Sequence, residues 1–223
     1  MDKQLLAQAL LKFTLGLLLT GLLLFVPAGT LNYPKAWLLL AVLFVPMFLA
    51  GIIMLFKRPD LLRRRLNLRE TEPRQKRVVA LSGVMFLCGF TVAGLDHRFG
   101  WLPMPGWVST AGAVLFVLAY LFYAQVLREN TYLSRTVEVQ PNQKVIDTGL
   151  YSVVRHPMYT ATLVLFLSMP LILGSVLAVP IFLFYIPIIA SRIQNEEQVL
   201  ERQLIGYSDY KKRVKYRLIP LIW

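Results

Sequence analysis

The sequence of 223 residues has a single cysteine, Cys88, and only two histidines, His97 and His156. One cysteine cannot form an intrachain disulfide or a thiolate cluster, and two histidines alone do not make a convincing metal site. No G-x-G-x-x-G motif follows a strand, and neither a P-loop nor a defensible Ser/His/Asp triad is present. These gaps argue against a Rossmann-type nucleotide domain, a P-loop nucleotide site and a triad hydrolase. We expect Cys88, inside an apolar run, to be a small packing residue.

Acidic residues are also few: 12 aspartates and glutamates stand against 24 lysines and arginines, for a net charge of +12, while 57% of the residues are hydrophobic. The basic residues lie between long apolar runs, and no basic groove interleaved with aromatics is evident. We therefore attribute the charge to membrane topology and expect no nucleic-acid partner. The composition predicts an all-α integral membrane protein.

Four apolar runs are long enough to cross a bilayer, which takes about 20 residues each. They are Leu10–Val26, Trp37–Phe56, Val78–Leu95 and Trp107–Leu127. A fifth run, Tyr159–Ala190, would make one helix of about 48 Å, too long for a single span. Because Pro170 and Gly174 interrupt it, we predict a hairpin of two short helices. The total is about six membrane helices.

The distribution of lysine and arginine predicts the orientation. The loop 57–77 holds nine basic residues, whereas the loops 27–36 and 96–106 hold one each. The positive-inside rule then places the 57–77 loop and both termini in the cytoplasm. Residues 128–158 and the tail 191–223 fall on that same face, so their polar side chains should meet there in a cytoplasmic pocket. His97 should lie on the opposite face from His156.

Three smaller features complete the organisation. The N-terminal segment has only a weak cleavage site at VPAGT, so we interpret it as a retained first span. The four tryptophans, at positions 37, 101, 107 and 223, lie near predicted membrane boundaries and suit interfacial anchoring. Residues 128–150 contain the only strand-like text and are expected to be an ordered re-entrant or surface connector, with a turn at Pro141–Asn142.

The stretch GLYSVVRHPMYTA, residues 149–161, places polar side chains at the start of the predicted hairpin. Pro157 favours the first turn of a helix, whose free N–H groups would point at a ligand above it. His156 and Tyr159 are three residues apart and can share a face, while Tyr151 and Tyr159 offer ring faces to a purine or a cation. Each residue alone is also compatible with an interfacial belt of snorkelling side chains.

A second polar element, SRIQNEEQVLERQL, covers residues 191–204. Arg192 and Glu196 are four apart on one helix face, and Glu197 lies on an adjoining face. The simplest interpretation is a surface ion pair worth less than about 1 kcal/mol. The order of arginine before glutamate is the weaker one for helix stability, which favours another role.

The stretch VQPNQKVIDTGLYSVVRHPMY, an apolar hairpin and then RIQNEEQVLERQLIGYSDYKKRVKYRLIP together resemble the isoprenylcysteine carboxyl methyltransferases. The likeness covers about residues 128–220, and these membrane enzymes use S-adenosylmethionine without a Rossmann domain. It suggests a four-span region, residues 1–127, and a methyltransferase-like region, residues 128–223, within one compact domain. Related phospholipid methyltransferases share the Arg-His-Pro-x-Tyr and Glu-Glu pattern, and membrane sterol reductases carry a similar C-terminal block.

The resemblance also implies site residues. Arg192 aligns with a substrate-binding arginine. The residues that align with cofactor-binding positions are Gln140, Gln143, Lys144, Val145, Ile146, Tyr151, His156, Pro157, Met158, Tyr159 and Glu196. Glu196 could pair with the ammonium of S-adenosylmethionine. The carboxylate or ribose of the cofactor could be held by His156, Tyr159 and helix-start N–H groups, and Tyr151 could pack on its adenine.

These features predict methyl transfer from S-adenosylmethionine to the carboxylate of a lipophilic, isoprenylcysteine-like or prenylated acceptor, with membrane lipids as the surroundings. Because a carboxylate is already nucleophilic, alignment and desolvation matter more than a base or a metal. No N-x-[ST] sequon is present, and we expect a prokaryotic plasma membrane. Three alternatives stay open: a phospholipid or amine N-methyltransferase, an NADPH-dependent membrane reductase, and a non-enzymatic membrane scaffold.

Overall fold

The computed structural model describes residues 2–67, 70 and 72–223, and most of these are helical. Four long helices come first: α1 (Lys3–Ala28), α2 (Pro34–Lys57), α4 (Pro73–Phe99) and α5 (Gly106–Glu129). The short α3 (Pro59–Leu66) lies between α2 and α4. After α5 come η1 (Gly149–Ser152), α6 (Pro157–Leu173), α7 (Ala178–Leu183), α8 (Tyr185–Gln203) and α9 (Tyr207–Arg213). The part of the 57–77 loop at residues 68, 69 and 71 lies outside the described residues.

Local chemistry explains where these helices begin and end. Asp2 caps α1 by accepting hydrogen bonds from the backbone N–H groups of Gln4 and Leu5. Proline occupies the first position of α2, α3, α4 and α6, where its missing N–H has no intrahelical partner to lose. Each of the four predicted spans is correct in place, and its helix runs several residues beyond the apolar run at one or both ends.

The spanning segments are confirmed, with one correction. Five segments of the described chain are long and apolar enough to cross a membrane, the last of them running from Ala178 to Gln203, and α6 is a shorter apolar helix of 17 residues. The predicted hairpin is present, since α6 ends at Gly174 and α7 starts at Ala178. Its second arm is not short, however. Helix α8 continues through the polar residues 191–203, because they remain good helix formers after the apolar run ends.

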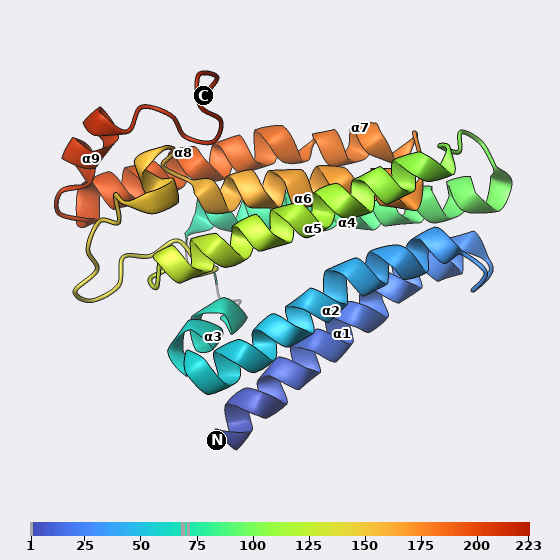
Figure 1. The fold of residues 1–223 in the computed structure, drawn as a ribbon, viewed down its shortest axis with the longest axis horizontal. Coiled ribbons are helices and arrows are strands. Elements are labelled where there is room, and N and C mark those ends of the chain that lie inside the picture. The colour runs from blue at the N-terminus through green and yellow to red at the C-terminus, as the bar shows by residue number, and fades with distance from the viewer. Residues whose placement is uncertain (1, 68–69, 71) are drawn as a thin grey trace.

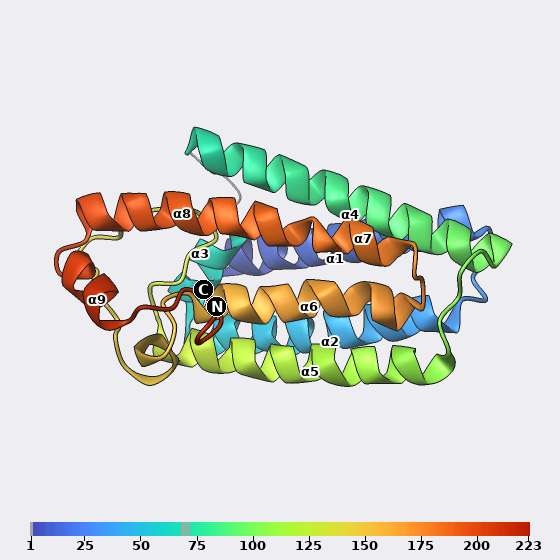
Figure 2. The ribbon, with the colours of Figure 1, turned by 90° about the horizontal axis from the view of Figure 1, so that it is seen from above.

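The helices form two layers. Figures 1 and 2 show α4, α7–α8, α6 and α5 side by side, with α1 and α2 covering one face of this layer. The closest neighbours are α5 with α6 and α1 with α4. A Cβ on Gly112 of α5 would lie 2.9 Å from the Cβ of Leu171 on α6, so this glycine allows the two backbones to approach closely. The core between the layers includes Leu39, Phe116 and Phe182, all fully buried.

The outer surface is largely apolar, as expected for helices that face lipid. Cys88 lies on this exposed face of α4, so the prediction that it packs in the interior is wrong: an apolar run alone does not show which face of a spanning helix turns outward. Trp37, Trp101 and Trp107 are also exposed, and they lie close to helix ends, where interfacial rings are stable.

The two ends of the bundle differ. At one end, the turn after α6 bonds to the loop after α4, with Met104 N donating to Gly174 O over 2.8 Å. His97, bonded to Asn32 O, lies at this end and far from His156, as predicted. The N-terminus, α3, the connector 130–148, α9 and the C-terminal segment gather at the other end (Figure 1). The connector contains no strand among the described residues and has its turn at Pro141–Asn142. Its alternating polar and apolar residues therefore do not pair as β-strands.

Candidate active site

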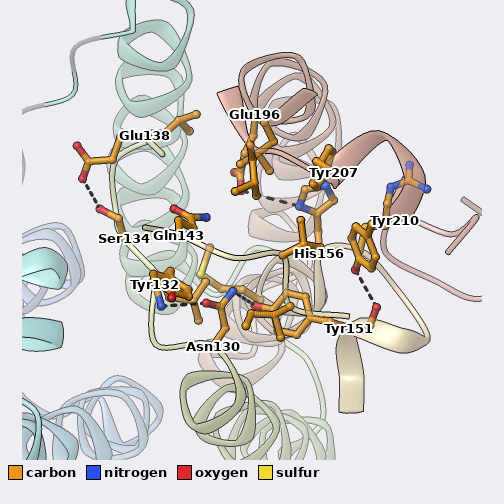
Figure 3. Close-up of a pocket in the computed structure, with 18 of the residues that line it drawn as sticks. Asn130, Tyr132, Ser134, Glu138, Gln143, Tyr151, His156, Glu196, Tyr207 and Tyr210 are labelled. Atoms are coloured by element: carbon orange, nitrogen blue, oxygen red, sulfur yellow. Dashed lines mark hydrogen bonds and ion pairs between the residues drawn. The ribbon is translucent and has the colours of Figure 1, made fainter. Parts of the chain in front are cut away.

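A pocket lies at this second end, between the connector, η1, the first turn of α6, α8 and α9 (Figure 3). Its empty space, counted with the open mouth, is about 820 Å³. The prediction that residues 128–158 and the tail converge on one surface is therefore confirmed in geometry. The side of the membrane on which that surface lies stays a prediction.

Most of the site residues predicted from the sequence line this pocket. They are Gln143, Lys144, Val145, Ile146, Tyr151, His156, Met158, Tyr159, Arg192 and Glu196. Two do not. Gln140 turns away, donating from Nε2 to Tyr132 O over 2.7 Å, and it braces the connector instead. Pro157 is buried at the first position of α6, where it starts the helix.

Tyrosines form the wall of the pocket on the side of η1 and α9. Asn130 Nδ2 donates to Tyr151 Oη over 3.1 Å, and Tyr210 Oη donates to Tyr151 O over 2.7 Å. The hydroxyl of Tyr207 is buried and has no hydrogen-bond partner among the described residues. Burial, and then the negative charges of Glu197 and Glu196, raise the pKa of Tyr207, so its phenol keeps its proton. An unsatisfied buried donor beside a pocket is a position where a ligand acceptor would be stabilised.

One hydroxyl connects the two charged residues that the sequence singled out. Tyr159 Oη accepts from Arg192 Nε over 2.8 Å and donates to Glu196 Oε2. Arg192 also donates from Nη2 to Arg135 O over 2.6 Å. The carboxylate and the guanidinium are thus held on either side of one phenol, which makes the site more than a surface ion pair.

His156 lies between two glutamates. Its Nδ1 is 4.0 Å from Glu196 Oε1 and its Nε2 is 3.3 Å from Glu197 Oε1. The start of α6 is not open above, however, because the N–H groups of Arg155 and His156 donate to the carbonyls of Tyr216 and Arg217. These two N–H groups precede the first helical residue, Pro157, and are not available to a ligand, while the expectation for the N–H groups of the helix itself stays a prediction. The C-terminal segment occupies that place.

Glu197, directly after Glu196 on α8, has a bracing role that the sequence did not reveal. It is 2% exposed, and its carboxylate accepts from Arg155 Nε over 2.7 Å and from Arg217 Nε over 2.9 Å. Arg155 also donates to the carbonyls of Val214 and Lys215. Glu197 therefore holds the C-terminal segment against the His156 loop. Helical spacing placed it beside Glu196, but a pairing between residues 155, 197 and 217 has no local signal.

Gly149 shapes the entry into η1. Its φ is +57°, and a Cβ there would lie 2.6 Å from the Glu129 carboxylate, which accepts a hydrogen bond from Leu150 N over 2.8 Å. We expect Gly149→Ala to lower the free energy of unfolding by roughly 1–3 kcal/mol, because the left-handed backbone and the close contact both disfavour a side chain. Thermal unfolding in detergent measures this change.

The matched control is Gly51→Ala, in the middle of α2, where a new Cβ meets nothing within 4 Å. Alanine should be neutral or stabilising there. Equal thermal shifts in both variants would contradict the role given to Gly149.

Comparisons with known proteins agree with this fold. The structure of the eukaryotic intramembrane Ras methyltransferase ICMT (isoprenylcysteine carboxyl methyltransferase) matches with a TM-score of 0.56 at 20% identity, over 92% of this chain and 74% of that one. The fold is thus that of a helical integral membrane protein of the ICMT type. Residues 107–205 match the family model described as phospholipid methyltransferase. The family match, over less than half of the chain, and the shared fold both support the resemblance of the motifs to the phospholipid and isoprenylcysteine methyltransferases.

A further relative comes from outside the methyltransferases. The mouse Delta(14)-sterol reductase TM7SF2 (Mus musculus) is 29% identical over 91 residues, which is 40% of this chain and 22% of that protein. The chain thus spans about a fifth of the length of this curated relative. The shared stretch accounts for less than half of the present chain.

Proposed function

We propose that the protein is an S-adenosylmethionine-dependent methyltransferase that acts on the carboxylate of a lipophilic, isoprenylcysteine-like acceptor at the membrane. The observation that carries this proposal is the Arg192–Tyr159–Glu196 arrangement at the pocket. A carboxylate suited to an ammonium and a guanidinium suited to an acid lie on two sides of one hydroxyl. Such a site can hold a cationic cofactor and an anionic acceptor next to each other.

The residues present fit S-adenosylmethionine. Glu196 would hold the ammonium, His156 and Tyr151 would contact the rest of the molecule, and the unpartnered Tyr207 hydroxyl would gain an acceptor. When bound, this cofactor supplies an electrophilic methyl group. Arg192 would orient the acceptor carboxylate, and the apolar surroundings would strip it of water. A carboxylate needs no proton removed, so no residue is required as a general base.

The position of the pocket at a bundle end suits this pair of ligands. A water-soluble cofactor can reach it from solvent, and a lipophilic acceptor can reach it from the bilayer. We place this end, with both termini, in the cytoplasm, because the basic 57–77 loop lies there and the positive-inside rule applies.

Calorimetric titration with S-adenosylhomocysteine, in detergent, tests the cofactor. We expect micromolar binding to the wild type and a loss of at least about tenfold in Glu196→Gln, because a charge-assisted contact of 1.5–3 kcal/mol disappears. Glu201→Gln is the control, since its carboxylate pairs with Lys211 at the surface. A folded wild type that fails to bind would refute the proposal.

The same titrations with other ligands separate the alternatives. The mouse reductase match makes NADPH the second ligand to try, and tight NADPH binding without S-adenosylhomocysteine binding would favour a reductase. A phospholipid amine is a poorer acceptor than an acid on physical grounds, because the Arg192 guanidinium repels a cation. If neither nucleotide binds, and Glu196→Gln changes nothing, a scaffold would be favoured.

A further inference from the structure

Three arginines from distant parts of the chain converge beside the pocket. Arg192 Nη2 donates to the carbonyl of Arg135 over 2.6 Å, and Arg65 Nη1 lies 3.5 Å from the carbonyl of Ser134. Consecutive residues have Cα atoms only about 3.8 Å apart, so these two guanidinium groups are anchored on neighbouring points of one strip of backbone. Arg135 extends from the same strip. We call Arg65, Arg135 and Arg192 the arginine cluster.

The cluster is tied to the rest of the site. Arg65 Nη1 is 3.7 Å from Met158 Sδ, and its Nη2 bonds to Tyr123 Oη. Met158, Ser134 and Arg192 all line the pocket. The arginine cluster therefore borders the pocket.

No member of the cluster forms an ion pair with a carboxylate among the described residues, whereas Arg63, Arg155 and Arg213 each do. Like charges held together destabilise the free protein unless an anion joins them. The pKa of Arg135 is lowered, because the surrounding protein removes water from its guanidinium and because Arg65 and Arg192 repel it. Such clusters of guanidinium groups suit phosphates and carboxylates.

Nearby acidic groups do not neutralise the cluster by contact. Of these acidic groups, Glu196 influences Arg192 most, but the two side chains meet through the Tyr159 hydroxyl. Glu70 also lies close enough to influence Arg192, but the hydrogen bond it accepts in this region comes from Val137 N. The Glu138 carboxylate accepts from the hydroxyls of Ser134 and Thr136, and Figure 3 shows it turned toward Ser134 at the edge of the pocket.

We propose that Arg65 and Arg135 form a second anion subsite, so that the acceptor is a lipophilic molecule with two acidic groups. One is the carboxylate that Arg192 orients, and the other is a further carboxylate or phosphate bound by Arg65 and Arg135. This proposal rests on the proposed methyl transfer, because the diacid is the molecule that would accept the methyl group. The anion subsite itself can be tested without any cofactor.

Calorimetry in a non-ionic detergent, without nucleoside, compares dodecylsuccinate, which has two carboxylates, with dodecanoate, which has one. We expect dodecylsuccinate to bind wild type at least about tenfold more tightly, since each charge-assisted contact adds over 1.4 kcal/mol. In Arg135→Gln the preference should shrink to under about threefold. The Arg135 guanidinium has no bonding partner among the described residues, so this variant should fold. Arg63→Gln on α3, whose arginine already pairs with Asp2, should keep the full preference.

Further measurements distinguish a lipophilic diacid from a free inorganic anion and test whether the anion binds next to Arg192. Arg192→Gln should weaken dodecylsuccinate as well, because the two acids bridge this residue and Arg135. Any of four results would overturn the proposal. The first two are a wild type with no preference for dodecylsuccinate over dodecanoate, and an Arg135→Gln variant that keeps that preference unchanged. The other two are an Arg192→Gln variant that keeps its affinity for dodecylsuccinate, and inorganic phosphate that binds the wild type as tightly as dodecylsuccinate does. S-adenosylhomocysteine binding is measured separately, so its failure would refute methyl transfer and leave the anion result readable.

Discussion

Replacing Glu197 by glutamine should lower the free energy of unfolding by about 3–5 kcal/mol, the cost of breaking a buried ion pair by removing one partner. Glu197 is 2% exposed and accepts hydrogen bonds from both Arg155 and Arg217. A neutral amide leaves the Arg155 guanidinium, which is also buried, without its counter-charge. Thermal unfolding in detergent, followed by tryptophan fluorescence, measures the loss.

The control for this prediction is on the same helix. Glu201→Gln, one helical turn further along α8, removes a solvent-exposed partner of Lys211 and should cost no more than about 1 kcal/mol. Glu197→Gln should also release the C-terminal segment, so that limited proteolysis cuts first near residues 214–218. A variant as stable and as protease-resistant as Glu201→Gln would show that the buried network does not hold this segment.

Hydrophobic run length predicted most of the bundle. The apolar run Trp107–Leu127 became α5, and Gly174 ended α6 as a residue with φ of +70° can. These features are visible in a sequence because they depend on neighbours along the chain. The polar part of α8 was predicted from the spacing of Arg192 and Glu196 rather than from run length, because a helix that leaves the bilayer continues in polar residues that a hydropathy window does not detect.

The interior and exterior faces could not be predicted in the same way. A spanning helix that is apolar all round has no moment to mark its packed side. Cys88 therefore had no signal to show that it faces outward, and neither had the buried Gln75, whose amide donates to Arg192 O. The packing of α4 against α1, α7 and α8 decides these positions.

The residues of the candidate site could likewise be predicted only where their signal is local in the sequence. Tyr159, Arg192 and Glu196 were identified because they belong to two short motifs, and the hairpin between those motifs brings them together. Arg65 was not identified. It lies in the 57–77 segment, whose basic charge had been explained by membrane topology alone. Its contact with Ser134 joins residues that are 69 positions apart in the sequence. Long-range pairing of this kind depends on how the two layers stack, which periodicity does not encode.

The largest effect on activity is expected from Arg192→Lys. The guanidinium bonds through Nε to Tyr159 Oη and through Nη2 to Arg135 O, so its plane is fixed by two contacts in different directions. A lysine ammonium is a single point of charge and cannot keep both contacts while also orienting a carboxylate. A misplacement of about 1 Å can cost 100-fold in rate, and we expect kcat to fall by about that factor.

Transfer of a radiolabelled methyl group to an N-acylated S-prenylcysteine measures the rate, and S-adenosylhomocysteine titration checks the cofactor site. Affinity for S-adenosylhomocysteine should stay within about twofold of wild type, because Glu196 remains in place and the change falls on the acceptor. Arg202→Lys, an exposed arginine in the last turn of α8, should leave both quantities unchanged. A full rate in Arg192→Lys would mean that positive charge alone is enough. A lost rate with equally lost cofactor binding would instead place Arg192 in the cofactor site, on the other side of the Tyr159 hydroxyl.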